Sequence, residues 1–187
     1  MSALRTATRE HHDRIDRLVN LTLLQDREHY ATVLQVFDAF LRAWEPAVQA
    51  ALPGRREWLQ ARSRLRFLQH DLRVLGIAAL PAIAALPAFA SPAAAWGSVY
   101  VMEGSALGGQ VITRSLAAAG LGPHTGAAYF HGWGEATAGL WRDARALLES
   151  ELSDPVALDH ACDGARGTFD SLTLLLEAAL HERTSAA

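Results

Sequence analysis

The chain has a single cysteine, no excess of positive charge and no long uninterrupted apolar run. Cys162 alone cannot form an intramolecular disulfide, which fits a reducing compartment. The net charge of −3 argues against a nucleic-acid binder, whose surface would be basic. The longest apolar stretch, Ile77 to Ala90, contains two prolines and is too short to span a bilayer, and no signal-peptide pattern follows Met1. We therefore expect a soluble, cytoplasmic protein that acts without nucleic acid or membrane.

The apolar residues recur at helical spacing along the whole sequence, without the strict alternation that marks a half-buried strand. Half of the 187 residues are hydrophobic, which is enough to build a core. We predict an all-α fold, a compact bundle of six to eight helices in a single domain over residues 1–187. An Ala- and Pro-rich connector is expected over residues 77–91. The predicted helices cover about residues 4–18, 27–52, 57–75, 96–116, 135–151 and 155–182.

Local signals mark several helix ends. Asp26 is a good N-cap for the second helix, Gly76 a stop for the third, and either Ser153 or Asp154 a cap for the last. Pro46 lies inside the second helix and need not end it, although a kink or a break is expected there. Most arginines of the third helix are expected to form a solvated face.

The most informative segment is Glu103–Gly109, which reads Glu-Gly-Ser-Ala-Leu-Gly-Gly. Its glycines lie inside a run that is otherwise helical and free of proline. Each interior glycine costs a helix about 0.5–1 kcal/mol relative to alanine. Bare backbone allows the close approach of a flat ligand or another helix, and Gly/Ser pairs are places where helices bend. The glycines alone do not separate helix packing from ligand binding.

The histidines do not form a common metal-binding motif. There is no His-x-x-x-His, Cys-x-x-Cys or Glu-x-x-His pair of the kind that a structural zinc or a di-iron bundle uses. His11 and His12 both lie in the first predicted helix and point about 100° apart. The apolar stripe of that helix favours His11 as the inward residue, whereas the neighbouring stripe with Arg5, Thr8 and His12 could line a polar-edged cleft. Periodicity does not decide between the two histidines.

A single histidine near a glycine-rich helix suits haem better than a non-haem metal. Haem iron needs only one protein ligand and leaves the opposite position open for a gas. The flat macrocycle needs a smooth wall, and its two propionates need cations at one edge, for which arginine is well suited.

Two segments resemble the haem oxygenase family. Leu4–His12 resembles its N-terminal helix, whose pattern is Leu-[Lys/Arg]-x-x-Thr-x-x-x-His. Tyr100–Val111 resembles the helix on the distal side of the haem, in the Glu-Gly-Ser-x-Leu-Gly form of the bacterial branch. The resemblance covers nearly the whole chain in length and helix order, and it implies a haem oxygenase-like all-α fold.

The resemblance implies roles for particular residues. His12 would be the proximal iron ligand, and Arg5 would lie near the propionates. The three matching glycines, which let the distal helix bend over the haem, are Gly104, Gly108 and Gly109.

The residue that follows the first of these glycines differs from that of the animal enzymes, which have a catalytic aspartate there. In this chain it is Ser105, so Ser105 and the backbone carbonyls of Gly104 or Gly108 are the candidates to hold a catalytic water. The C-terminal half matches less closely. Its candidates are Phe169 as a pocket wall and Arg142 or Arg145 as a second propionate partner. In the distal helix, Tyr100 is a candidate to contact the macrocycle.

A haem oxygenase uses haem b as both cofactor and substrate. With O₂ and electrons it cleaves haem to biliverdin, CO and ferrous iron, and its kinked distal helix directs O₂ to one meso carbon. The chain has no Gly-x-Gly-x-x-Gly fingerprint after a strand, so the resemblance implies an external electron donor such as ferredoxin or a flavoprotein reductase. A photoreceptor that accepts the bilin is a further candidate partner.

Other classes remain open from the sequence. A haem carrier or sensor on the same fold would bind haem without turnover, and the sequence barely separates it from an enzyme. A bundle that processes thiamine fragments would need an acid partner for Cys162, and none is visible. A purely structural module would bind no haem.

Overall fold

The computed structural model describes residues 1–83, 86 and 88–186, and all regular structure in this part of the chain is helical. The predicted all-α fold is confirmed. The elements are α1 (Ser2–Val19), η1 (Leu23–Gln25), α2 (Arg27–Ala51), η2 (Pro53–Arg55), α3 (Arg56–Ala61), α4 (Leu65–Leu75), α5 (Pro92–Ala117), α6 (Ala128–His131), η3 (Gly134–Ala136), α7 (Thr137–Glu151) and α8 (Pro155–Ala186), where η marks a 3₁₀ helix.

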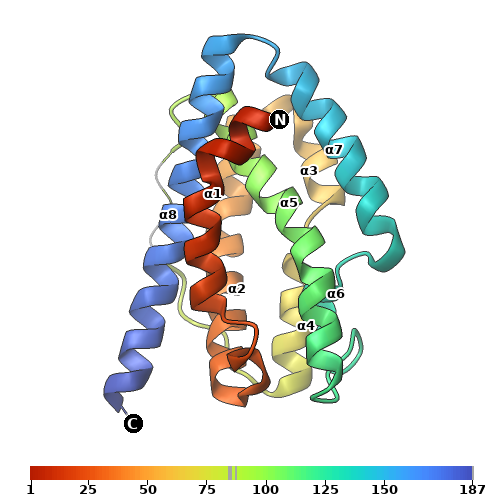
Figure 1. The fold of residues 1–187 in the computed structure, drawn as a ribbon, viewed down its shortest axis with the longest axis vertical. Coiled ribbons are helices and arrows are strands. Elements are labelled where there is room, and N and C mark those ends of the chain that lie inside the picture. Colours follow the sequence, from red (N-terminus) through yellow and green to blue (C-terminus); the bar gives the residue numbers. More distant parts are fainter. Residues whose placement is uncertain (84–85, 87, 187) are drawn as a thin grey trace.

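Helix α8 is the element on which the other long helices assemble. Helices α1, α2 and α5 all pack against it, whereas α4, α6 and α7 extend the bundle on the far side of α2 and α5. Figure 1 shows that α5 lies close to α8 near the top of the molecule and runs away from it below, with α1 in front. The buried core between the helices is aliphatic and aromatic, and it includes Leu4, Leu34, Phe40, Val99 and Leu176.

The predicted helix ends are largely confirmed. Asp26 Oδ1 accepts a hydrogen bond of 2.8 Å from the His29 N–H, and Gly76 ends α4 with a φ of +67°. At α8 the cap is Asp154, whose Oδ2 accepts from the Ala157 N–H, rather than Ser153. A break at Pro46 does not occur, because α2 continues through this residue to Ala51.

The prediction of one helix over residues 57–75 is wrong. Helix α3 ends at Ala61 and α4 begins at Leu65, so Arg62, Ser63 and Arg64 form a break. The expected solvated arginine face is also wrong at Arg62 and Arg64. Both side chains are buried, because the break turns them toward α5, which supplies acceptors for their N–H groups.

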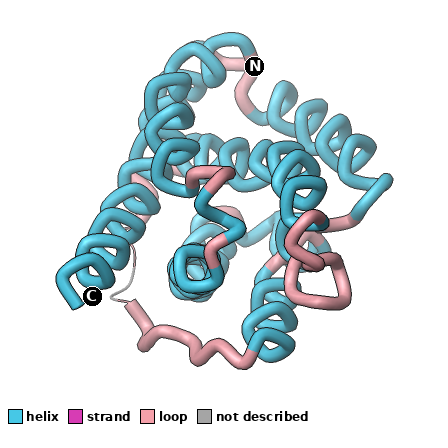
Figure 2. The backbone as a smooth tube through the Cα atoms, turned by 60° about the horizontal axis from the view of Figure 1, so that its bottom comes forward, coloured by secondary structure: helices cyan, strands magenta, loops and turns pink. Residues whose placement is uncertain are grey.

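The predicted connector, Ile77–Ser91, includes residues 84, 85 and 87, which lie outside the described residues. Two side chains of α2 hold its first part: Gln35 Nε2 donates to the Ala78 carbonyl, and Arg42 Nη2 donates to the Leu80 carbonyl. Figure 2 shows the described residues that follow α4 as a loop along one side of the bundle. Within the described residues, none of the helices combines the length and the apolar character that crossing a membrane would require.

Candidate functional site

One face of α5 is bare and exposed in the lower half of the helix. Around Gly108 no other atom lies within 4 Å of the position that a Cβ would take. Leu107 and Val111, on the same side, are 38% and 50% exposed. One turn earlier, a Cβ on Gly104 would lie 3.5 Å from the Trp141 ring of α7, an ordinary contact. This face therefore offers a flat ligand a wall of backbone and aliphatic side chains.

Two other glycines of α5 serve helix packing. A Cβ on Gly97 would overlap the Ala161 carbonyl of α8, and one on Gly109 would lie 2.5 Å from the Phe130 carbonyl oxygen of α6. Gly109 is buried. Of the three predicted haem-contact glycines, the structure thus brings Gly104 and Gly108 to the open face and turns Gly109 toward α6.

Helix α1 lies alongside this face of α5. Burial raises the pKa of the Tyr100 hydroxyl, and the positive charge of Arg5 on α1 opposes that rise. From Arg5 to His12 helix α1 advances about 10 Å, and from Tyr100 to Gly108 helix α5 advances about 12 Å. Both helices descend in Figure 1. From these rises we expect His12 to lie at about the level of Gly104–Gly108. Helix α1 packs on α8 and makes few direct contacts with α5. The two helices are therefore neighbours that do not pack tightly against each other.

The His12 side chain is 58% exposed, and its Nδ1 lies 3.1 Å from Asp16 Oδ2, one helical turn away. This hydrogen bond is the main reason that the pKa of His12 is raised, and partial burial opposes it. Within the described part of the chain, Nε2 of His12 has no hydrogen-bond partner. Holding one imidazole nitrogen through a carboxylate orients the ring and prepares the other nitrogen to bind a metal. The Asp16 partner was missed in the sequence, although its i,i+4 spacing from His12 could have indicated it.

His11 has different surroundings. Its Nε2 lies 3.5 Å from Asp170 Oδ1 of α8, and its Nδ1 is buried without a hydrogen-bond partner among the described residues. Phe169, 7% exposed, lies beside both histidines, with ring-centroid distances of 6.4 Å to His11 and 6.0 Å to His12. Of the pair, His12 has the more accessible ring, because its side chain is 58% exposed and that of His11 is 27% exposed.

Two cationic side chains act on the hydroxyl of Tyr100. The charges of Arg5 on α1 and Arg145 on α7 both oppose the burial-driven rise in the pKa of Tyr100, and Arg145 Nη2 also lies 3.9 Å from Glu149 Oε1. The Tyr100 ring packs on Trp141 at 5.7 Å between centroids. Arg142 is exposed and is not among the charges that act on Tyr100. The structure therefore separates the two arginine candidates that the sequence left equivalent.

Ser105 lies at the border of the open face. Its hydroxyl donates to the Met102 carbonyl at 2.8 Å and accepts from Arg64 Nη2 at 2.6 Å. Arg64 also donates to the Met102 carbonyl at 2.6 Å. Sequence reasoning missed Arg64, because its approach to α5 depends on the break between α3 and α4, which no proline or glycine announces.

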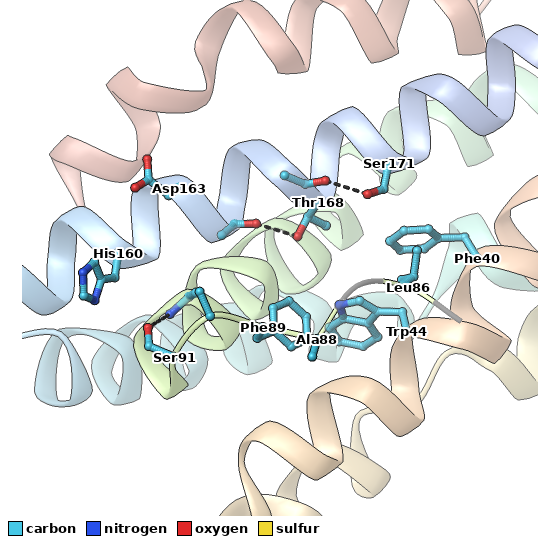
Figure 3. A pocket seen from close by; sticks show the side chains of 14 residues that line it. Phe40, Trp44, Leu86, Ala88, Phe89, Ser91, His160, Asp163, Thr168 and Ser171 are labelled. Atoms are coloured by element: carbon cyan, nitrogen blue, oxygen red, sulfur yellow. Dashed lines mark hydrogen bonds between the residues drawn. The ribbon is translucent and has the colours of Figure 1, made fainter. Parts of the chain in front are cut away.

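A separate pocket of about 480 Å³ lies between α2, the connector and α8. Figure 3 shows Trp44 and Phe40 of α2, Phe89 of the connector, and Thr168 and Ser171 of α8 around it. In the same view α1 lies beyond α8. None of the predicted site residues lines this pocket, and Phe169 and His12 lie on the other side of α8 from it.

Comparisons with known proteins identify the family. The family model described as Heme oxygenase matches residues 1–178. A heme oxygenase from Xanthomonas campestris pv. campestris (strain 8004) is 38% identical over 153 residues, which cover 77% of this chain and 86% of that protein. The NO- and CO-bound heme oxygenase structures from Neisseria meningitidis superpose with a TM-score of 0.81 at 25% identity, covering 94% of this chain and 89% of that one. Heme oxygenase 2 from Chlamydomonas reinhardtii, solved without heme, shares the fold, with a TM-score of 0.72, 23% identity and 94% coverage of each chain. The chain therefore belongs to the heme oxygenase family of haem-degrading oxidoreductases.

Proposed function

We propose that this protein cleaves haem b to biliverdin, CO and ferrous iron, with O₂ and electrons from an external donor. The observation that carries the proposal is the pairing of one exposed imidazole with one bare helix face. Asp16 holds Nδ1 of His12, whose Nε2 has no hydrogen-bond partner among the described residues, and nothing lies within 4 Å of the position that a Cβ on Gly108 would take. A disc-shaped ligand between them would meet a ligating nitrogen on one side and backbone on the other.

The side chains around this space fit haem. Haem supplies the redox-active iron and the conjugated ring that is opened. His12 Nε2 would bind the iron, and Asp16 would hold the imidazole in one orientation. Leu107 and Val111 would cover the apolar part of the ring, while the missing side chain at Gly108 would let the macrocycle lie against α5.

The cationic side chains at one edge of this space would set the orientation of the haem in its own plane. Arg5 and Arg145, beside Tyr100, would bind the propionates, since guanidinium groups match carboxylates in shape and charge. With the propionates at this end, the apolar edge of the ring faces toward Leu107 and Val111. Phe169 would form the wall behind His12.

The distal side would control water and access. Ser105 and the carbonyls of Gly104 or Gly108 would hold a water and supply protons through it. Close packing of the α5 backbone over the ring would restrict the position of bound O₂ and would thereby direct cleavage to one meso carbon. Gly109 would act indirectly, by letting α6 support α5.

The electrons would come from a separate protein. Ferredoxin or a flavoprotein reductase would approach the haem edge that Arg5 and Arg145 border, because an acidic donor is attracted to exposed arginines. A bilin-accepting photoreceptor would receive the product.

An aerobic turnover experiment tests the proposal. Haem is bound under anaerobic conditions, and O₂ and a reductant are then added while the Soret band, CO and extracted pigments are measured. We expect the Soret band to disappear with release of CO and a bilin. His12→Ala should abolish the axial histidine signature and turnover, whereas the matched His11→Ala should retain both. Recovery of intact haem from the wild type would instead identify a carrier or sensor.

A further inference from the structure

A pair of buried arginines lies behind the distal face of α5. Arg62 Nη1 donates to Glu103 Oε2 at 2.8 Å, with the two side chains 8% and 12% exposed. Arg64, 7% exposed, reaches the next turn, where its Nη2 contacts the Met102 carbonyl and the Ser105 hydroxyl. Both arginines come from the break between α3 and α4. A buried charge is costly unless it is paired and hydrogen-bonded, so these contacts hold the break against α5.

The contacts of the Ser105 hydroxyl determine its polarity. Arginine can only donate hydrogen bonds, and a carbonyl can only accept them. The Arg64 Nη2–H groups therefore donate to Ser105 Oγ and to the Met102 carbonyl, and the single hydroxyl hydrogen of Ser105 is committed to that same carbonyl. One acceptor position remains on Oγ. Ser105 is an exposed residue, so a water molecule can reach that position.

We propose that Arg64 is a positioning residue that makes the Ser105 hydroxyl an acceptor only, so that a water bound to it must donate one hydrogen to Ser105 and keeps the other for the haem side. This inference rests on the proposed function. Ser105 would then orient a proton-donating water and would not donate a proton itself. A serine without Arg64 could rotate, donate to the same water and leave it facing the other way.

Contacts with two neighbouring elements hold the Arg64 side chain in place. Its guanidinium carbon lies 4.9 Å from the centroid of the Tyr129 ring, in addition to the two contacts on α5. Tyr129 is itself fixed, because its N–H donates to the buried carboxylate of Asp71. Cation–π contact and two hydrogen bonds leave the guanidinium little freedom. The Ser105 rotor is therefore held from a rigid element of the protein.

A double-mutant cycle tests whether Arg64 acts through Ser105. Wild type, Arg64→Met, Ser105→Ala and the double variant are loaded with haem, reduced and exposed to CO, which does not turn over. The C–O stretching frequency reports hydrogen-bond donors on the distal side. Arg66→Met is the matched control, because Arg66 is exposed and lies over Phe67 on α4. Thermal unfolding of each haem-free variant shows whether it is folded.

We expect the C–O stretch to move to higher frequency in Arg64→Met and in Ser105→Ala, with no additional shift in the double variant. Turnover should fall roughly tenfold or more in both single variants, since positioned proton transfer contributes about 10²–10⁴-fold to rates. Arg66→Met should match the wild type in both measurements. Should Arg64→Met not fold, Arg64→Lys replaces it with the same expected direction, because one mobile ammonium does not reproduce the fixed fork.

The outcomes separate this inference from the proposed function. An unchanged C–O band in Arg64→Met, or shifts that simply add in the double variant, would overturn the role of Arg64 while haem cleavage by the wild type stands. A wild-type protein that binds no haem would overturn the proposed function itself.

Discussion

Gly97 and Gly108 lie on the same side of α5 and have opposite surroundings. They are eleven residues apart, which is close to three helical turns and about 16 Å along the axis. At Gly97 the backbone of α8 is so close that a Cβ would overlap the Ala161 carbonyl, whereas at Gly108 nothing lies within 4 Å. Figure 1 shows the cause, because α5 and α8 meet near the top and diverge below. One face of one helix thus serves packing at one end and is available to a ligand at the other.

The comparison shows that a helix glycine has no single meaning. The crossing is reciprocal, since a Cβ on Gly164 of α8 would overlap the Ala94 carbonyl of α5. This close crossing sets the angle from which α5 and α8 diverge, and α1 packs against α8. The packing glycines therefore help to create the space that the open glycines line.

The largest effect is expected from Gly97→Ala. The added methyl would displace backbone rather than a flexible side chain, so the apo protein should lose about 3 kcal/mol or more of its free energy of unfolding, or fail to fold. Urea denaturation followed by circular dichroism measures this. Gly167→Ala, in α8 with nothing within 4 Å, is the matched control and should gain about 0.5–1 kcal/mol. Equal stabilities of the two variants would contradict the packing role of Gly97.

Changes at Gly108 should affect binding instead of folding. Gly108→Ala should stabilise the apo protein by about 0.5–1 kcal/mol, because the backbone is helical and the space is open. Gly108→Leu should fold normally and yet lose haem binding or shift the site of cleavage, since its side chain would stand where the ring lies. Soret titration and product separation measure these effects. Wild-type affinity and product in Gly108→Leu would remove the argument for close approach of the ring.

Much of the fold could be predicted, because its signals are local. Asp26, Gly76 and Asp154 act within one helical turn of themselves, so capping chemistry alone places those helix ends. The break at residues 62–64 could not be predicted in this way. It is stabilised by acceptors on α5, about forty residues away, and periodicity carries no information about such contacts.

The sequence named the candidate site residues, whereas their relative geometry required the structure. The family pattern selected His12 against the apolar stripe, and the structure gives His12 the more accessible ring. The separation of Gly108 from Gly109, and of Arg145 from Arg142, depends on where α6 and Tyr100 lie. Neighbouring helix residues differ by 100°, so no single-helix pattern could tell which one faces the ligand.

The open half of the molecule should also respond to pH, through α1. Asp16 raises the pKa of His12, so the protonated pair stabilises the apo protein slightly below the ordinary histidine pKa, and that stabilisation is lost as pH rises through the raised value. Haem binding has the opposite sign, because only the neutral imidazole can bind iron. Affinity should therefore increase as pH rises through the pKa of His12. In Asp16→Asn the midpoint should move to lower pH, which Soret titrations between pH 5 and 9 would detect; coincident midpoints would contradict the linkage.

The smallest effect is expected at the charged edge of the open half, where Arg145 and Arg142 form a matched pair one helical turn apart on α7. Arg145 acts on Tyr100 and Arg142 does not, so Arg145→Ala should weaken haem binding while Arg142→Ala should not. Exposed ion pairs contribute about 0–1 kcal/mol, which limits the loss in affinity to roughly fivefold. Because exposed charges are screened by salt, the difference between the variants should shrink between about 0.01 M and 1 M salt. Equal affinities of the two variants at low salt would contradict a propionate contact by Arg145. The contrast between the two ends of α5 would remain.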